Sequence, residues 1–229
     1  MSHLPRGILK IFAIFVFVSL TFLIILPTIQ VLAAPTALWN TFGAKKKISK
    51  KGVPQVKGVY AFMTTPDTPI GFGQKTFGPV GVSDLRKTFA ESGPFKTCAL
   101  WCEYHPYSSY QDINGIGNER DRADINLLPN GWYEYRTSVF ILDLWRMEFC
   151  DGNGCIVLRD ENLGTNRLPY AAAGGEGIDA NFGPVTPAAF KWRNVKGLWA
   201  NACYTDVVGT VAGRVTRCGN NFDWTVEFP

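Results

Sequence analysis

The chain has 229 residues, six cysteines and a formal net charge of +4. The charge is uneven, because residues 1–51 hold seven Lys or Arg and no acid, which leaves sixteen basic and nineteen acidic side chains in residues 52–229. This mildly acidic remainder lacks the basic surface of a nucleic-acid-binding domain, so we expect no nucleic-acid partner. Its length, about 180 residues, is enough for one domain with a core of its own.

The most informative segment is uncharged and apolar. Residues 1–10 form a short basic N-terminus, and residues 11–34 follow without a single charge. Twenty-four helical residues would span roughly 36 Å, more than the hydrocarbon core of about 30 Å. We therefore predict a transmembrane anchor, or uncleaved signal, that contacts the lipid bilayer through residues 11–34. A cleaved signal peptide is the alternative, since Val31, Leu32 and Ala33 resemble a cleavage site.

Residues 35–55 contain five lysines, and we expect them to form a basic linker. These lysines alone would place the following domain in the cytosol. The even number of cysteines, all beyond the apolar segment, favours an oxidising compartment instead. We expect a single-pass membrane protein whose C-terminal domain is periplasmic, extracellular or lumenal, or a secreted protein if the signal is removed.

Residues 56–229 are predicted to form a disulfide-stapled β domain. Its first strand covers residues 56–65, with Val59, Ala61 and Met63 on one face. A Ser83 cap predicts a short helix over residues 84–91, and one or two helical turns are expected over residues 95–103. The polar residues 107–130 are expected to form a long surface loop, a candidate binding element.

The strongest strand signal covers residues 132–149, which are dense in aromatic and β-branched side chains. Residues 164–187 are expected to be irregular, with residues 171–177 as the most flexible part. Three strand-like segments, 190–195, 198–208 and 214–228, end the chain. The predicted fold class is mainly β: one antiparallel β-sandwich or barrel-like domain with one or two short helices, preceded by one N-terminal transmembrane helix.

The cysteine spacing predicts two disulfide-linked hairpins. Cys150 and Cys155 flank Gly152-Asn153, which suits a two-residue turn with the cysteines directly opposite one another. Cys203 and Cys218 are symmetric about residues 210–211, which predicts a second such hairpin. Cys98 and Cys102 could bridge each other, but six cysteines allow fifteen pairings and the sequence does not choose among them. A cysteine zinc site is the alternative that the export signal disfavours.

Histidine and acidic side chains limit the possible chemistry. With only His3 and His105 present, a His-rich metal site is excluded, and we interpret His105 as a partly exposed residue at a helix end. Among the nineteen acids, Asp143 and Glu148 are the first candidates for a catalytic carboxylate pair. An irregular calcium site is conceivable, although a solvated loop is favoured, at Asp112, Asn114, Asp121 and Asp124.

No constellation in the sequence demands catalysis, and we predict no catalytic residue, cofactor or metal site. The favoured function is a non-catalytic, membrane-anchored exoplasmic or periplasmic domain, acting as a structural or accessory subunit of a membrane or envelope complex with other protein subunits as partners. The alternative is a secreted carbohydrate-binding or carbohydrate-active protein with a cleaved signal peptide. Exposed tryptophans would support that alternative, since aromatic rings stack on sugars.

Overall fold

The computed structural model describes residues 39–50, 52–84, 86–180, 182–210 and 213–227. The predicted anchor, residues 11–34, lies outside these residues. In the described ranges no helix is long and apolar enough to cross a membrane. Every regular element in them is a β-strand, so the one or two predicted short helices are absent from the part of the chain described.

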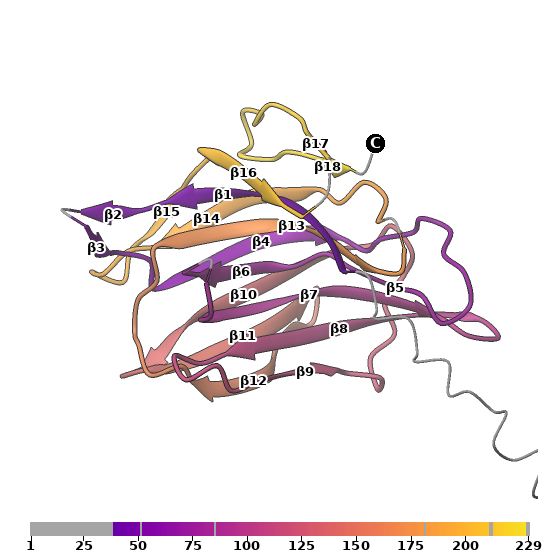
Figure 1. Cartoon of the computed structure of the whole chain (residues 1–229), viewed down its shortest axis with the longest axis horizontal. Coiled ribbons are helices and arrows are strands. Elements are labelled where there is room, and N and C mark those ends of the chain that lie inside the picture. The colour runs from indigo at the N-terminus through magenta and orange to yellow at the C-terminus, as the bar shows by residue number, and fades with distance from the viewer. Residues whose placement is uncertain (1–38, 51, 85, 181, 211–212, 228–229) are drawn as a thin grey trace, which may run out of the picture. The chain divides into compact units, whose positions relative to one another are not determined.

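Two antiparallel sheets form the domain (Figure 1). The larger has eight strands in the order β16-β1-β13-β5-β7-β8-β9, with β6 also pairing with β13 and β7. Its strands are β1 (Trp39–Lys47), β5 (Lys75–Phe77), β6 (Val80–Ser83), β7 (Phe89–Cys98), β8 (Cys102–Gln111), β9 (Gly117–Asp121), β13 (Tyr170–Ile178) and β16 (Asp206–Gly209).

The smaller sheet has six strands in the order β12-β11-β10-β4-β14-β15. Its strands are β4 (Gly58–Thr64), β10 (Trp132–Ile141), β11 (Leu144–Asp151), β12 (Gly154–Asn162), β14 (Pro187–Arg193) and β15 (Trp199–Asn201). Two short pairs complete the elements: β2 (Ser49–Lys50) with β3 (Val53–Pro54), and β17 (Arg214–Val215) with β18 (Val226–Glu227).

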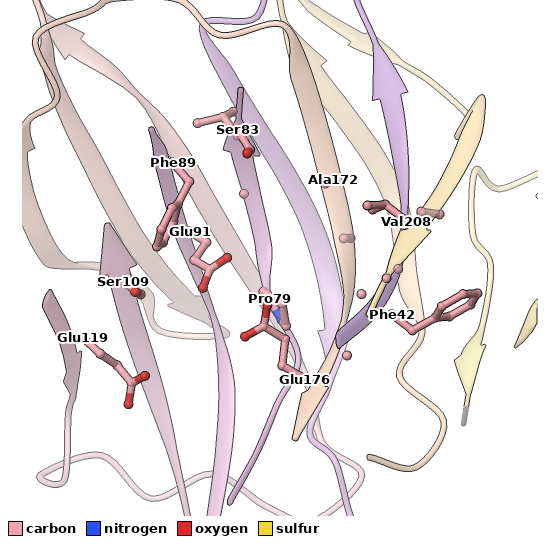
Figure 2. Close-up of a pocket in the computed structure, with 18 residues that line it drawn as sticks. Phe42, Pro79, Ser83, Phe89, Glu91, Ser109, Glu119, Ala172, Glu176 and Val208 are labelled. Atoms are coloured by element: carbon pink, nitrogen blue, oxygen red, sulfur yellow. The ribbon is translucent and has the colours of Figure 1, made fainter. Parts of the chain in front are cut away.

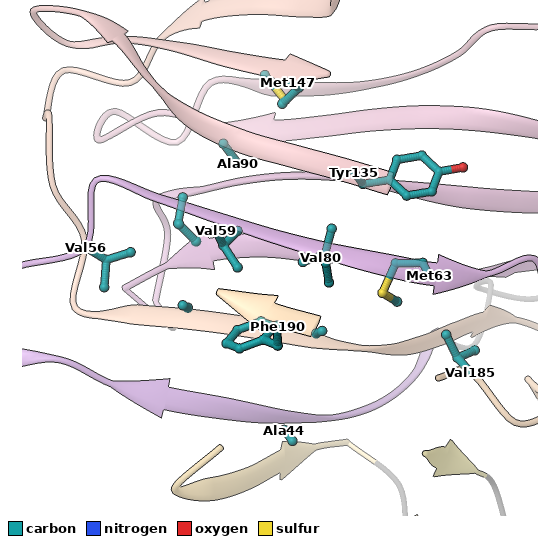
Figure 3. Packing of buried hydrophobic residues seen from close by; sticks show 14 of the residues in the cluster. Ala44, Val56, Val59, Met63, Val80, Ala90, Tyr135, Met147, Val185 and Phe190 are labelled. Carbon is teal, nitrogen blue, oxygen red and sulfur yellow. The ribbon is translucent and has the colours of Figure 1, made fainter. Parts of the chain in front are cut away.

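The core lies between the two sheets, which confirms the sandwich prediction. Strand β4 places the predicted Val59, Ala61 and Met63 in the core, each fully buried. Alternate residues of the larger sheet, such as Val80 and Ala90, belong to the same cluster (Figure 3). Because successive side chains of a strand point to opposite faces, the residues between these core positions lie on the outer face of the larger sheet.

Both predicted helices are wrong, because strand pairing prevails over local propensity there. The cap-like Ser83 ends β6, and the Asp84 carboxylate accepts hydrogen bonds from the backbone N–H groups of Arg86, Lys87 and Thr88 in a tight turn. The second predicted helix falls on β7 and the start of β8. Cys98 ends β7 and Cys102 begins β8. The two cysteines are paired across the turn that connects these strands and form a disulfide, with their Cα atoms 4.0 Å apart.

The region expected to be most flexible, residues 171–177, belongs to strand β13 inside the larger sheet. Its Gly and Ala residues pair with β1 on one side and with β5 and β6 on the other. A Cβ atom on Gly174 would lie 2.6 Å from the carbonyl oxygen of Phe42, so only glycine allows this approach. A strand without large side chains shows no alternation of apolar and polar residues, so strand β13 could not be recognised from the sequence.

Part of the stretch expected to be a basic linker, residues 35–55, forms β1 and the short pair β2 and β3. Strand β1 pairs with β13 and β16. The Lys45 ammonium lies 3.5 Å from the Asp206 carboxylate and 5.0 Å from the centre of the Tyr170 ring. At this position a lysine therefore belongs to the folded sheet.

Two further segments differ from the sequence interpretation. The loop expected over residues 107–130 contains the second half of β8 and all of β9. The long strand expected over residues 132–149 is a hairpin of β10 and β11, in which Ile141 pairs with Leu144. Leu142 adopts a φ of 48° in this turn, a conformation typical of two-residue hairpin connections, and Asp143 follows it in the turn rather than in a buried strand face.

The predicted Cys150–Cys155 hairpin is confirmed, with Asp151 paired to Gly154 as expected. The Cys203–Cys218 disulfide is confirmed as well. The hairpin proposed around it is wrong, because β16 pairs with β1 and β17 pairs with β18. All six cysteines are bonded, which excludes a zinc site made of cysteine thiolates and supports an oxidising compartment.

Phe190 provides a test of the core. It is fully buried, with its ring centre 4.8 Å from that of Trp224. We expect Phe190→Ala to lower the free energy of unfolding by about 3–5 kcal/mol, because it leaves a cavity between the sheets. Phe72→Ala is the matched control, since Phe72 is 80% exposed, and should change it by less than about 0.5 kcal/mol. Equal losses in denaturant titrations would contradict this assignment of the core.

Candidate functional site

A groove of about 380 Å³ lies along the outer face of the larger sheet (Figure 2). Residues from nearly every strand line it, from Val208 and Gly209 on edge strand β16 to Glu119 on edge strand β9. A single cavity can be lined from both edges only if the sheet curves, so this face is concave. The strong twist and coiling of large antiparallel sheets produce such curvature.

The floor of the groove is made of small residues. Gly43, Gly81, Ala172 and Gly174 line it on adjacent strands. Gly81 lies directly opposite Glu91, and a Cβ atom at position 81 would be 2.5 Å from the Glu91 Cβ. The absence of a side chain at Gly81 therefore leaves room for the glutamate above the sheet.

Three glutamates from three strands line this groove: Glu91 of β7, Glu119 of β9 and Glu176 of β13 (Figure 2). Glu91 and Glu119 lie in one row across the sheet, with Ser109 of β8 paired to each of them. Glu176 lies opposite Phe77. Glu91 and Glu176 are half-buried, whereas Glu119 is exposed on the edge strand.

The Glu91 carboxyl favours its protonated form. Burial, and then the carboxylates of Glu176 and Glu119, raise the pKa of Glu91 well above its ordinary value, although a hydrogen bond from the Tyr107 hydroxyl opposes this. That hydrogen bond has an O–O distance of 3.4 Å. Burial and the same three glutamates raise the pKa of Tyr107. The Tyr107 hydroxyl is thus within electrostatic reach of all three glutamates, which line one cavity.

The other two carboxyl groups are also shifted. Burial, followed by the Glu119 carboxylate, raises the pKa of Glu176 to about 7. Desolvation raises the pKa of Glu119, the Lys75 ammonium opposes this shift, and Asp121 adds to it. Burial and mutual repulsion therefore favour the protonated form of both Glu91 and Glu176 over that of a free glutamate.

An aromatic cluster beside the glutamates explains much of their desolvation. Phe77, Phe95 and Tyr107 are buried on the outer face, and Ile178 packs against them. The ring centre of Phe77 lies 4.9 Å from those of both Phe95 and Tyr107. These rings lie beside Glu176 and Glu91 and remove water from one side of each carboxyl group.

A protonated carboxyl beside an ionisable one can donate a proton and accept another within the same site. Paired acids whose surroundings separate their protonation states commonly act as the general acid and the general base of a hydrolase. The groove therefore has the chemistry for acid–base hydrolysis. Among the described residues, no group of three His, Cys, Asp or Glu side chains is arranged to hold a metal ion.

The candidates chosen from the sequence lie outside the groove. Asp143 is in the β10–β11 turn, and Glu148 is opposite Arg136 in the smaller sheet. His105, expected to be partly exposed, is buried on β8, with its Nδ1 2.8 Å from the Ile125 carbonyl oxygen. Burial was missed because the segment was interpreted as a helix end.

The four oxygen-bearing residues considered for calcium serve other contacts or lie apart. Asp112 accepts hydrogen bonds from the backbone N–H groups of Asn114 and Ile116, and Arg122 binds Asp124 through two hydrogen bonds of 2.7 Å. Asp121 is on β9, where it pairs with Tyr107. These contacts account for the positions of the acidic side chains without a bound cation.

Sequence reasoning missed all three groove glutamates, because each lay in a segment assigned to another structure. Glu91 ended a predicted helix, Glu119 lay in the predicted surface loop, and Glu176 lay in the region expected to be flexible. A signal was present at Glu91, since Phe89, Glu91 and Gly93 alternate with the small residues Ala90 and Ser92. For Glu176, surrounded by glycines and alanines, no comparable pattern exists.

Comparison with solved structures finds the same fold in peptidases. Two structures of scytalido-glutamic peptidase, with a peptide-based transition state analogue and with a transition state analogue inhibitor, match at TM-scores of 0.57 and 0.59 and 12% identity. SCP-B, a member of the eqolisin family of peptidases in complex with the tripeptide Ala-Ile-His, matches at 0.52 and 11% identity. Each alignment covers 85% of this chain and 100% of the other.

No family model matches the chain, and no curated protein matches it. At 11–12% identity the structural likeness shows the fold alone. The expected non-catalytic function is nevertheless contradicted, because the three solved structures named above are all of peptidases. Of the tryptophans relevant to the carbohydrate alternative, Trp145 and Trp224 are buried in the core, whereas Trp132 and Trp199 are exposed on the smaller sheet, outside the groove.

The raised pKa values predict how stability depends on pH. A folded state that binds a proton more tightly than the unfolded chain loses stability as pH rises from about 4.5 toward the folded pKa, by at most about 1.4 kcal/mol per pH unit for each proton. We expect the free energy of unfolding to fall between pH 5 and pH 8 through Glu91 and Glu176.

The double variant Glu91→Gln/Glu176→Gln should flatten this profile and be more stable than the wild type at pH 8, because it buries no carboxylate in the groove. Glu148→Gln, in the other sheet, is the matched control and should leave the slope unchanged. Denaturant titrations at several pH values measure it. A double variant with the wild-type slope would show that these carboxyl groups are not shifted.

Proposed function

We propose that this protein is a peptidase that hydrolyses peptide bonds with a pair of glutamates, Glu91 and Glu176, in the groove of the larger sheet. The observation that supports it most is the pair itself: two half-buried carboxyl groups, both with a raised pKa, in a cavity open to a polymer substrate. The names of the structural neighbours add support, since they are glutamic or eqolisin peptidases with peptide or transition-state-analogue ligands.

The shape of the groove suits an extended chain. Its floor of Gly43, Gly81, Ala172 and Gly174 presents backbone and small side chains, so a substrate backbone can approach the sheet closely. Apolar side chains stand at its margins, with Phe89 on β7 and Val208 on β16. A folded substrate protein would have to offer a loop or terminus to reach the glutamates.

The two carboxyl groups take complementary roles. Glu176, whose pKa is raised to about 7, acts as a carboxylate and accepts a proton from a water molecule whose oxygen attacks the peptide carbonyl carbon. Glu91, protonated, donates a hydrogen bond to the carbonyl oxygen and stabilises the charge that develops there.

Collapse of the tetrahedral intermediate completes the reaction. The C–N bond breaks, the proton held by one of the two glutamates passes to the leaving nitrogen, and the products are a carboxylic acid and an amine. The net change is the addition of one water molecule, with no other reactant. The pair must hold one proton at the start, so activity falls both when it is fully protonated and when it is fully ionised.

Activity assays of single variants test these roles. We expect Glu176→Gln and Glu91→Gln each to lower kcat/KM for an unstructured peptide by about 10²–10⁴-fold, since neither amide can take part in proton transfer. The wild-type profile should have an acid limb well above pH 4.5, because ionisation of the pair is shifted upward. Retained cleavage in either variant would contradict the proposed roles.

Glu148→Gln is again the matched control for these assays. It removes a glutamate from β11 in the smaller sheet and touches none of the groove. We expect its kcat/KM to equal that of the wild type. A comparable loss in this variant would mean that the effect of the groove substitutions is one of general stability.

We also propose that this peptidase works at a membrane surface in an oxidising compartment. The three disulfides support the compartment, and the uncharged residues 11–34 support an anchor. The full chain should then stay with membranes after an alkaline wash and need detergent for release. Recovery of the chain in the soluble fraction, with a mass lacking the first 33 or 34 residues, would instead show a secreted enzyme.

A further inference from the structure

Strand β9 carries one of the groove glutamates and is weakly supported. It is an edge strand of five residues, Gly117–Asp121, and every one of them is exposed. Its ladder connects it only to β8 among the described strands. A short exposed edge strand frays unless something outside the sheet holds it, and then Glu119 would have no fixed position in the groove.

Arg159 reaches β9 from the other sheet. It belongs to β12, and its side chain is only 4% exposed. One guanidinium nitrogen donates to the Asn118 carbonyl oxygen at 2.8 Å, and the other donates to the Asn118 side-chain oxygen at 3.1 Å. The guanidinium carbon also lies 5.1 Å from the centre of the Tyr110 ring. The guanidinium thus joins the smaller sheet to both β9 and β8.

Arg159 also forms one long ion pair, with Glu161. Its Nε is buried without a hydrogen-bond partner, and the nearest acid oxygen, Oε1 of Glu161, is 3.6 Å away. Burying a guanidinium costs desolvation free energy, which these contacts offset, and both of its hydrogen bonds go to β9. Asn118 directly precedes Glu119, and neighbouring residues of a strand face opposite ways.

We propose that Arg159 is a positioning residue for the groove: by holding Asn118 it fixes strand β9 and thereby keeps Glu119 in the same row of the sheet as Glu91. This inference rests on the proposed peptidase function for its effect on activity. The mechanical part, that Arg159 determines where Glu119 lies, can be measured without any substrate.

Glu119 matters because of the charges that face it. Asp121 on its own strand and Lys75 on β5 act on it directly, and it acts in turn on Glu91 and Glu176. Its negative charge helps Glu91 to keep the proton that the reaction needs. Once β9 is released, Glu119 can turn to solvent, and Glu91 would then ionise at lower pH.

The test compares Arg159→Met with Arg146→Met in the full chain in detergent. Arg146 lies on the neighbouring strand β11 and makes two hydrogen bonds with Asp160, at 2.8 and 2.7 Å, without contacting β9. The readouts are the titration midpoint of the Glu91 carboxyl carbon by ¹³C NMR and the pH profile of kcat/KM. Glu119→Gln provides the reference for loss of the charge.

We expect Arg159→Met to lower the Glu91 midpoint by about one pH unit, as Glu119→Gln does. It should also lower kcat/KM by about 10- to 100-fold through misplacement of the groove charges. Arg146→Met should change neither. Arg159→Lys keeps the charge and most of the apolar stem but loses the two-pronged contact. Its Glu91 midpoint and kcat/KM should lie between those of the wild type and Arg159→Met. It replaces the methionine variant if that variant does not fold.

Two results would overturn the inference. In the first, Glu119→Gln shifts the titration midpoint of Glu91, but the Arg159 variants leave it at the wild-type value. In the second, Glu119→Gln itself leaves the Glu91 midpoint unchanged. If the wild type cleaves no peptide but the Arg159 and Glu119 variants shift Glu91 together, the positioning role stands and the peptidase proposal fails. The two ideas are thereby tested separately.

Discussion

Repulsion among three carboxyl groups in one partly desolvated groove is the constraint on which the site depends. Glu91, Glu119 and Glu176 come from three strands of a single sheet, and no arginine or lysine is bonded to any of them among the described contacts. Burial and the neighbouring negative charges raise the pKa of each of these groups, so the groove retains protons to a higher pH than free glutamates would. A retained proton beside an ionisable carboxyl is what acid–base hydrolysis requires.

Glycines in the larger sheet make room for this arrangement. Gly81 is paired with Glu91 on the adjacent strand, and Gly43 pairs with Gly174 in the strands beyond it. A glycine in a strand interior weakens the strand. Several glycines in one sheet therefore indicate that the sheet permits the close approach of another chain. The smaller sheet provides the core that the larger one needs, and through Arg159 it also supports the edge strand that carries Glu119.

Elements marked by side-chain alternation or by turn residues could be predicted from the sequence. Elements without either signal were missed. Strand β4 and the Cys150–Cys155 hairpin have strong local signals, and both are confirmed. Strand β13 has neither large apolar residues nor turn residues at regular spacing, so its position is set by pairing partners distant in the chain. The glutamates were missed for the same reason: their meeting is a property of sheet order, with β7 and β13 brought together through β5 and β6.

The most direct measurement is the analysis of products formed in H₂¹⁸O. The full chain and the Glu91→Gln/Glu176→Gln double variant would be incubated with a mixture of unstructured peptides between pH 4 and pH 8, and the products identified by mass spectrometry. We expect the wild type to give internal cleavage products with one ¹⁸O in each new carboxyl terminus, and the double variant to give none. The absence of cleavage by the wild type at every pH, or equal cleavage by both chains, would contradict the proposal that these glutamates hydrolyse peptides.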